Sequence, residues 1–283
     1  MNISLQLKTK ILIIFLFISF FSDIFSQSKV TEIQPEFYYS NGNFSTNTTS
    51  NGFYGFANVI INDFDIVRIG YNKIIFDNPE WKYNQTNYSI GGVKNLYPFY
   101  IKTSFLYMDG DFDYKPFFSK YSDNLYTVAL EIDYNVNLFY VGINFAYTNF
   151  NTASDSLVSL NSKQFGLPLT YEPSSSFLIS ITPTYTTLSD RGDLISTEVL
   201  LKYSPSKDLT AYLSGFFGER AYFYNHNLYT IYNQNSTQTS AVNFVVEYKT
   251  SDKVTLVAGY TYTEFEDYLI NYYTLGLKLS FPQ

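Results

Sequence analysis

The sequence predicts an all-β fold, and both its composition and its alternation of apolar and polar residues support this. A fifth of the 283 residues are aromatic, and only 15% are charged, whereas about 25% of residues are charged in soluble proteins. Mean hydropathy is nevertheless close to neutral, at -0.10. A chain that mixes apolar and polar residues this finely fits a wall one residue thick, with lipid on one side and water on the other.

The alternation has the period of two that is typical of a strand with two different faces. From residue 273 to residue 281, Tyr, Leu, Leu, Leu and Phe alternate with Thr, Gly, Lys and Ser. The same pattern recurs at 126–134, 177–184, 242–248 and 254–262. We therefore expect Leu277 to face lipid and Thr274 to face water.

Connections between the alternating runs are short and long in turn. Short polar connections fall near 62–65, 94–98, 135–137, 172–175, 204–208 and 251–253. Longer ones fall near 41–51, 77–85, 109–124, 149–161, 189–193, 220–235 and 264–267. This pattern predicts a single antiparallel up-and-down transmembrane β-barrel of about 14 strands, within a range of about 12 to 16. An even strand number places both termini on the short-turn side and the long connections on the opposite, outer side.

Two prolines fall inside expected strands. Pro168 and Pro183 cannot donate a ladder hydrogen bond, so each predicts an irregularity, which we interpret as a bulge.

The N-terminal segment has the order of regions found in a secretory signal. Lys8 and Lys10 precede an apolar run at 11–21, and a polar stretch follows. The run is too short for a membrane-spanning helix. We expect a cleaved signal peptide at 1–26 and a barrel domain at 27–283, with an uncleaved anchor as the alternative.

Together these features resemble bacterial outer-membrane β-barrel proteins as a class. The resemblance is carried by the signal at 1–26, the alternating strands and the closing strand at 272–281. Such proteins commonly end in an aromatic residue, whereas here Phe281 is followed by Pro282 and Gln283. The resemblance implies the cell outer membrane as the location. It also implies passive transport, enzymology or surface anchoring, without choosing among them.

Our first functional hypothesis is a porin-like channel for passive diffusion of small hydrophilic solutes. A barrel of this size is wider than side chains alone can fill, and its expected inward faces are rich in Thr, Ser, Asn and Gly. Strands begin almost at once, so no N-terminal plug domain is expected. The first alternative is a non-transporting barrel that anchors or scaffolds a surface or secretion assembly. The second is a barrel enzyme, although we expect no catalytic activity.

Charged inward positions predict a ring near the short-turn mouth of the lumen. The ring comprises Arg68, Lys102, Glu131, Asp133, Glu198, Lys202 and Glu247. If the lumen is open, its acids should favour cations; alternatively, these groups pair across neighbouring strands and brace the barrel end. Tyrosines on the lipid-facing side before the short turns predict a periplasmic aromatic girdle of Tyr134, Tyr171, Tyr203 and Tyr248.

The single histidine, His226, lies in the expected outer loop at 220–235, and we interpret it as a surface residue rather than a catalytic one. Asp109, Asp111 and Asp113 resemble the alternate acids of a calcium loop, but the turn glycine and the bidentate glutamate of that loop are missing. We interpret this stretch as a solvated loop, and Arg191-Gly192-Asp193 as an ordinary tight turn.

Other site chemistries find no support in the sequence. The chain has no cysteine, which excludes a disulfide framework and a thiolate metal site. Its net charge of −7 comes without a basic cluster, which argues against a nucleic-acid partner. We expect no cofactor and no metal, and outer-membrane lipid and small hydrophilic solutes as partners.

Overall fold

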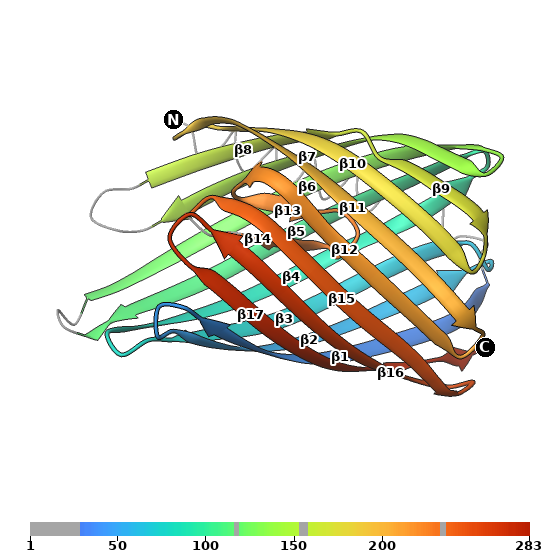
Figure 1. Cartoon of the computed structure of the whole chain (residues 1–283), viewed down its shortest axis with the longest axis horizontal. Helices are drawn as coiled ribbons and strands as arrows, with labels where there is room; N and C mark the ends of the chain where they lie inside the picture. The colour runs from blue at the N-terminus through green and yellow to red at the C-terminus, as the bar shows by residue number, and fades with distance from the viewer. Residues whose placement is uncertain (1–28, 116–118, 153–157, 233–235) are drawn as a thin grey trace.

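The computed structural model describes residues 29–115, 119–152, 158–232 and 236–283. The expected signal peptide at 1–26 lies outside these residues, so it stays a prediction. The described chain forms long antiparallel strands that close into a barrel (Figure 1). Among the described residues there is no helix long and apolar enough to cross a membrane.

The wall is built from strands in chain order. Its first half contains β1 (Val30–Phe44), β2 (Thr49–Ile61), β3 (Asp65–Asp77), β4 (Trp81–Leu96), β5 (Phe99–Tyr114), β6 (Ser119–Val136) and β7 (Phe139–Thr152). Its second half contains β8 (Val158–Gly166), β9 (Leu169–Ser174), β10 (Phe177–Leu188), β11 (Gly192–Ser206), β12 (Leu209–Arg220), β15 (Gln238–Ser251), β16 (Val254–Phe265), β17 (Leu269–Leu279) and β18 (Phe281–Pro282). A separate hairpin, β13 (Phe223–Asn225) and β14 (Thr230–Tyr232), is inserted between β12 and β15.

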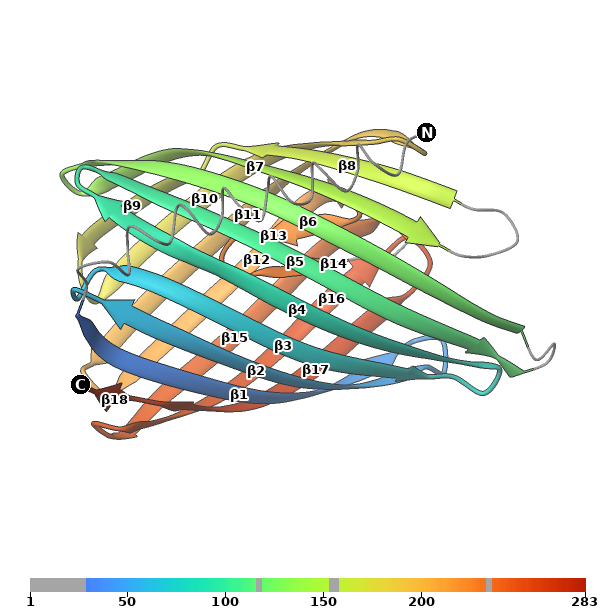
Figure 2. The same ribbon diagram turned by 180° about the vertical axis from the view of Figure 1, so that it is seen from behind.

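Each wall strand pairs with its neighbour in the sequence, and the first pairs with the last. β8 and β9 together act as one wall strand, and β18 continues β17, so the barrel has 14 strands. β1 pairs with both β17 and β18, which closes the wall (Figure 2). The described chain begins and ends at the short-turn end, where the Lys29 backbone amide donates to the side-chain Oδ1 of Asn62 at 3.1 Å. The predicted fold class and strand number are confirmed.

The outward face of the wall is more apolar than the inward face, as the alternation in the sequence predicts. Leu275, Ile195 and Phe37 point outward and are each more than half exposed. Inward positions on the same strands, such as Ser196 and Ser40, are buried. At these positions the wall presents apolar side chains to its surroundings and small polar ones to its lumen.

Aromatic side chains form part of the outward face. Tyr71, Tyr88, Tyr107 and Tyr126 lie directly opposite one another on β3, β4, β5 and β6. The rings of Tyr71 and Tyr88 are 5.5 Å apart. Such cross-strand aromatic pairs stabilise a sheet in addition to burying apolar area.

The tyrosines expected in a periplasmic girdle also lie on the outward face, beside the short turns. Tyr134, Tyr203 and Tyr248 are exposed there, and Tyr171 is half-buried. Phe99 and Phe139 pack against two of them, with ring centroids 5.0 Å from Tyr134 and 4.8 Å from Tyr171. Their role at a membrane boundary stays a prediction.

The long connections are shorter than predicted, because the strands continue into them. β1 ends at Phe44 and β2 begins at Thr49, so most of the expected loop at 41–51 is strand. Most of 109–124 is strand as well. The predicted boundaries were wrong for a physical reason: at these strand ends the outward positions carry polar residues such as Asn41, Asp109 and Asp111, as a loop would. Composition alone therefore does not show where a strand ends.

The acidic stretch at 109–113 is part of this extension. Asp109, Asp111 and Asp113 belong to β5, and their strand neighbours Gly110 and Phe112 take the inward positions. The interpretation as a solvated loop was therefore wrong. Among the described residues, no cluster of three or more His, Cys, Asp or Glu could hold a metal ion.

The two strand prolines coincide with a break in the wall. Pro168 lies between β8 and β9, and β10 pairs with β8 through 184–188 and with β9 through 177–181. Pro183 faces the gap between them, where its carbonyl accepts a hydrogen bond from the Leu167 amide at 3.0 Å. The irregularity that the sequence predicts is present, in the form of an interrupted strand.

Candidate functional site: a hairpin inside the barrel

The connection between β12 and β15 folds into the lumen. β13 and β14 lie inside the wall in both views (Figures 1 and 2). Tyr222 and Tyr224 on this segment are 4% and 1% exposed. The prediction that 220–235 lies outside the barrel is therefore wrong for residues up to 232; residues 233–235 lie outside the described part of the chain.

The hairpin has its own local structure. β13 pairs with β14, and the side chain of Asn225 caps the turn between them. Its Oδ1 accepts hydrogen bonds from the backbone amides of Asn227 at 2.9 Å and Leu228 at 3.0 Å. Asn favours such turns because its short side chain can bond to the following backbone. The turn is therefore compact enough to enter the lumen.

A wall residue fixes the hairpin backbone in the way a neighbouring strand would. The Tyr224 amide donates to Gln164 Oε1 at 3.1 Å, and Gln164 Nε2 donates to the Tyr224 carbonyl at 3.0 Å. The Tyr224 hydroxyl is also 2.6 Å from Ser104 Oγ on β5. A buried backbone amide or carbonyl without a hydrogen-bond partner destabilises the fold. The bonds to Gln164 supply the partners that the Tyr224 backbone needs inside the lumen.

Apolar side chains on the inner wall receive one face of the hairpin. Tyr224 and Ile231 join a buried cluster formed with Leu106, Met108, Leu125, Ala129 and Ala146. A second cluster holds Ala221 and Tyr222 against Leu160, Leu188 and Leu194. These wall residues occupy inward positions, where a water-filled lumen would require polar side chains. Their apolar character is the sequence signal that could have revealed the hairpin.

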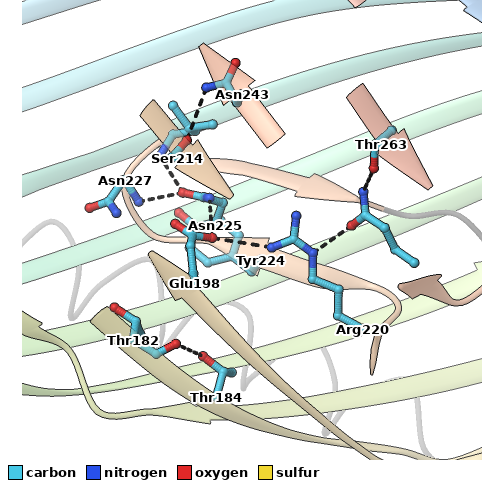
Figure 3. A network of polar contacts seen from close by, with 12 residues as sticks. Thr182, Thr184, Glu198, Ser214, Arg220, Tyr224, Asn225, Asn227, Asn243 and Thr263 are labelled. Carbon is cyan, nitrogen blue, oxygen red and sulfur yellow. Dashed lines mark hydrogen bonds and ion pairs between the residues drawn. The ribbon is translucent and has the colours of Figure 1, made fainter. Parts of the chain in front are cut away.

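Charged side chains fix the base of the hairpin (Figure 3). Arg220 lies 3.3 Å from Glu198 and donates to Gln238 at 2.6 Å. Glu198 also accepts from Asn225 Nδ2 at 3.3 Å. The Arg220 guanidinium stacks on Phe216, 3.5 Å from its ring centroid. The electron-rich face of the ring stabilises the positive charge of the guanidinium.

The tip of the hairpin reaches the charged residues of the wall. His226 Nδ1 lies 3.7 Å from Glu131 Oε2, and its side chain is only 8% exposed. The interpretation of His226 as a surface residue was therefore wrong. Burial, together with the Lys102 ammonium, lowers the pKa of His226 to about 3. The imidazole is therefore neutral near pH 7.

The residues of the expected charge ring form separate ion pairs. Lys102 bridges Glu131 and Asp133, with Asp133 at 3.0 Å. Arg68 pairs with Glu36 at 3.2 Å, and Glu247 with Lys278 at 2.6 Å.

Two members of the expected ring lie apart from these pairs. Glu198 pairs with Arg220 at the base of the hairpin. Lys202 faces inward from β11, opposite Tyr212. The sequence did not indicate Glu36, Arg220 or Gln164 as site residues, because only the register and the infolded hairpin bring them to these partners.

A cavity of about 260 Å³ lies beneath the hairpin. Its roof is the stretch from Phe223 to Asn227, and its wall is formed by strands β5 to β11. It extends to Tyr140, Glu172 and Leu178, which lie beside the short turns. We call this space the short-turn cavity. It is lined mainly by charged and hydrogen-bonding side chains.

Substitution of Gln164 should loosen the hairpin. In Gln164→Leu, the buried amide and carbonyl of Tyr224 lose their partners, at about 1–3 kcal/mol for each group. We expect the 221–232 segment to become cleavable by protease while the barrel stays intact. Limited proteolysis of folded protein followed by mass spectrometry measures this. Equal resistance of Gln164→Leu and the wild type would contradict the anchoring role, and Thr255→Val, at an inward position remote from the hairpin, is the matched control.

Comparison with known proteins gives a fold but no sequence family. No protein-family model matches the sequence, and no curated protein sequence matches it significantly. Among solved structures, the CymD monoaromatic hydrocarbon channel matches with a TM-score of 0.58, over 91% of this chain and 89% of that chain, at 6% identity. The fold is that of a bacterial outer-membrane β-barrel.

Two further structures share this fold. The toluene transporter TodX of P. putida matches with a TM-score of 0.51, covering 93% of this chain and 91% of that one, at 7% identity. CdiB from Acinetobacter baumannii matches at 0.56, covering 88% of this chain and 60% of that one, at 8% identity. At such identities the likeness concerns the fold alone, because one architecture carries many functions.

Proposed function

We propose that this barrel lies in the cell outer membrane and is a channel for passive diffusion of small hydrophilic solutes, constricted by the hairpin at 221–232. The observation that carries the proposal is the short-turn cavity, a space of about 260 Å³ that contains charged and hydrogen-bonding side chains inside the wall of a 14-stranded barrel. Barrels of eight strands are filled by their own side chains, whereas wider ones leave interior space. Here one chain segment occupies part of that space.

The chemistry of the cavity favours polar solutes over hydrocarbons. The names of CymD and TodX mention monoaromatic hydrocarbons and toluene. The cavity of the present barrel is lined by Lys102, Glu131, Asp133, Glu172 and Glu198. An apolar molecule placed there would displace water from these groups without replacing its hydrogen bonds, which costs free energy.

A scaffold barrel that does not transport is the second candidate. The observation that favours it is the number of independent contacts that hold the hairpin. These are two apolar clusters, the hydrogen bonds between Gln164 and the Tyr224 backbone, and the ion pair of Arg220 with Glu198. A segment held by this many contacts would keep the lumen closed, as a barrel that does not transport requires. Conductance separates the two candidates.

Conductance of the purified barrel in a planar lipid bilayer tests the channel proposal. We expect defined single-channel steps with a modest preference for cations, because acids outnumber bases around the cavity. The preference should fade as salt rises, since charges are screened over about 10 Å at 0.1 M ionic strength. Absence of conductance from protein shown to be folded would reject the channel and favour the scaffold.

Neutralising three inward acids should reduce that preference. In a Glu131→Gln, Asp133→Asn, Glu247→Gln variant, Lys102 and Lys278 lose their partners, and the lumen becomes more positive. Reversal potentials across a salt gradient should shift toward anions without closure of the channel. Glu80→Gln, in an exposed turn at the outer end, is the matched control and should leave the reversal potential unchanged. A variant with the wild-type reversal potential would reject the selectivity role.

A further inference from the structure

Aromatic side chains gather on the inward face of the barrel at the end of the long connections. They belong to the ends of β1, β3, β4, β5 and β6 that lie on the left in Figure 1. The register places four of them directly opposite one another from strand to strand: Phe76, Tyr83, Phe112 and Tyr121. Phe76 is in turn opposite the buried residue Ser50, so the row faces the lumen.

The rings form a continuous series of contacts. Ring centroids are 5.8 Å apart between Phe76 and Tyr83, and 6.3 Å apart between Tyr83 and Phe112. Phe112 also contacts Tyr121 at 6.1 Å and stacks on Trp81 at 5.5 Å. Phe44 on β1 continues the series from Phe76 at 6.0 Å. We call these six side chains the aromatic arc: Phe44, Phe76, Trp81, Tyr83, Phe112 and Tyr121.

The rings of the arc keep surface that a ligand can reach. Each of the six side chains is only half-buried, whereas the inward residues Leu106 and Met108 deeper in the lumen are covered by the hairpin. Apolar surface that faces water is unfavourable, and burial of that surface by a ligand recovers free energy. A contiguous exposed apolar patch is therefore a mark of a binding site.

A carboxylate lies beside the rings. The Tyr83 hydroxyl donates to Asp123 Oδ2 at 3.0 Å. Asp123 follows Tyr121 by two positions on β6, so it shares the inward face, and it is half-buried like the rings. A carboxylate offers about four lone-pair sites, so Asp123 can accept hydrogen bonds from a ligand as well as from Tyr83.

The arrangement of rings in a row favours an extended ligand. Neighbouring strands lie about 4.8 Å apart, so the row from β3 to β6 covers about 14 Å. A compact organic cation is bound best where rings enclose it on several sides, which a row does not do. A hydrocarbon would cover Asp123 and the tyrosine hydroxyls without hydrogen-bonding to them, which costs free energy.

A chain of sugar units matches both features of the arc. Each unit has a face of C–H groups, which packs on an aromatic ring, and hydroxyl groups around its edge, which donate to a carboxylate. A chain repeats these features from unit to unit, as the arc repeats its rings from strand to strand. The negative charge of Asp123 disfavours an acidic sugar, since like charges repel.

We propose that the aromatic arc is a binding site for a short neutral oligosaccharide, which stacks on the rings and donates hydrogen bonds to Asp123. The site lies at the mouth by which a solute would enter from the side of the long connections. The inference deepens the proposed channel function by naming a class of solute. It rests on that function for the passage of the sugar, but not for its binding.

Binding can be measured without transport, because Trp81 is the only tryptophan of the chain and belongs to the arc. Its fluorescence would be followed in the folded barrel, in a detergent without a sugar headgroup. The ligands are maltopentaose, cellopentaose and chitopentaose, with glucose and the open-chain polyol sorbitol for comparison. We expect a saturable change with at least one pentasaccharide, at an affinity at least about tenfold above that of glucose, because several rings stack at once.

Three outcomes would overturn the proposal. The first is the absence of a saturable change with all three pentasaccharides. The second is equal binding of sorbitol, which has the hydroxyl groups but no ring face. The third is tighter binding of tetramethylammonium or of benzyl alcohol, which would assign the rings to a cation or to an aromatic solute.

Variants locate the site. Phe112→Ala removes the central ring of the arc and should lower the affinity for the bound pentasaccharide by about tenfold. Phe112→Tyr keeps a ring and should retain most of the affinity. Tyr107→Ala, which removes a ring from the outward face of the same strand, is the matched control. Wild-type affinity in Phe112→Ala would overturn the assignment.

Failure of the site and failure of the channel are distinguishable. Folded protein that binds a pentasaccharide but gives no conductance would reject the channel and retain the site. A conducting barrel whose Trp81 fluorescence responds to none of the sugars would reject the site alone. If Phe112→Ala does not fold, the comparison of ligands on wild-type protein still decides the proposal.

Discussion

Replacement of residues 221–236 by a turn of about four residues should raise the single-channel conductance severalfold. β12 and β15 pair as far as Arg220 and Gln238, so a short turn can join them without disturbing the wall. The hairpin fills part of the lumen, and its loss widens the path for ions. A planar-bilayer recording of wild type and variant under the same salt measures the effect.

The control for this experiment is a change of equal kind outside the lumen. Replacing the exposed turn at 78–80 by glycines should leave the conductance unchanged. A hairpin-deleted barrel with the wild-type conductance would show that the hairpin does not limit the passage. A barrel that opens only after the deletion would show that the hairpin closes the native lumen, as the scaffold candidate requires.

Leu275→Arg should destabilise the barrel by about 2–4 kcal/mol, whereas Thr274→Arg should change its stability much less. Leu275 is 66% exposed on the outward face near the middle of β17, so an arginine there would meet the hydrocarbon of the bilayer. Thr274, its neighbour, faces the lumen, where a long charged side chain can reach water. Denaturant titration of protein folded into lipid vesicles gives the free energies of unfolding.

The adjacent positions make this pair a direct test of the wall. Both variants introduce the same side chain at nearly the same depth. The difference between their free energies of unfolding therefore reports only which face of the strand carries the arginine. Equal destabilisation by the two substitutions would show that the assignment of lipid-facing and lumen-facing positions is wrong. A larger loss for Thr274→Arg would mean that the lumen at this level has no room for the side chain.

The barrel could be predicted from sequence because its main signals are local. The face of a strand residue follows from its parity, and the number of strands follows from the number of alternating runs. Neither depends on the strand ends. Those ends were misplaced at 41–51 and 109–124, since the strands continue through these residues while their polar composition resembles that of a loop.

The hairpin was missed because its evidence is spread across distant parts of the chain. Its own sequence resembles an outer loop, and the contact between Ser104 and Tyr224 spans 120 positions. The available hint lay on the wall, where Leu106, Met108 and Leu125 occupy inward positions. The partners of the inward charges were likewise hidden: parity assigns Arg68 and Glu36 to the lumen, but only the register brings them to 3.2 Å.

The wide separation of the hairpin from its docking residues has a consequence for folding order. Gln164 and Ser104 lie on β8 and β5, whereas the hairpin comes later in the chain, after β12. Contacts between distant residues form slowly, because the intervening chain must first be ordered. The wall strands that carry Gln164 and Ser104 must therefore be in place before the hairpin can bind to them. We expect newly closed barrels to pass through a short-lived state with an undocked hairpin, which would be more permeable than the mature protein.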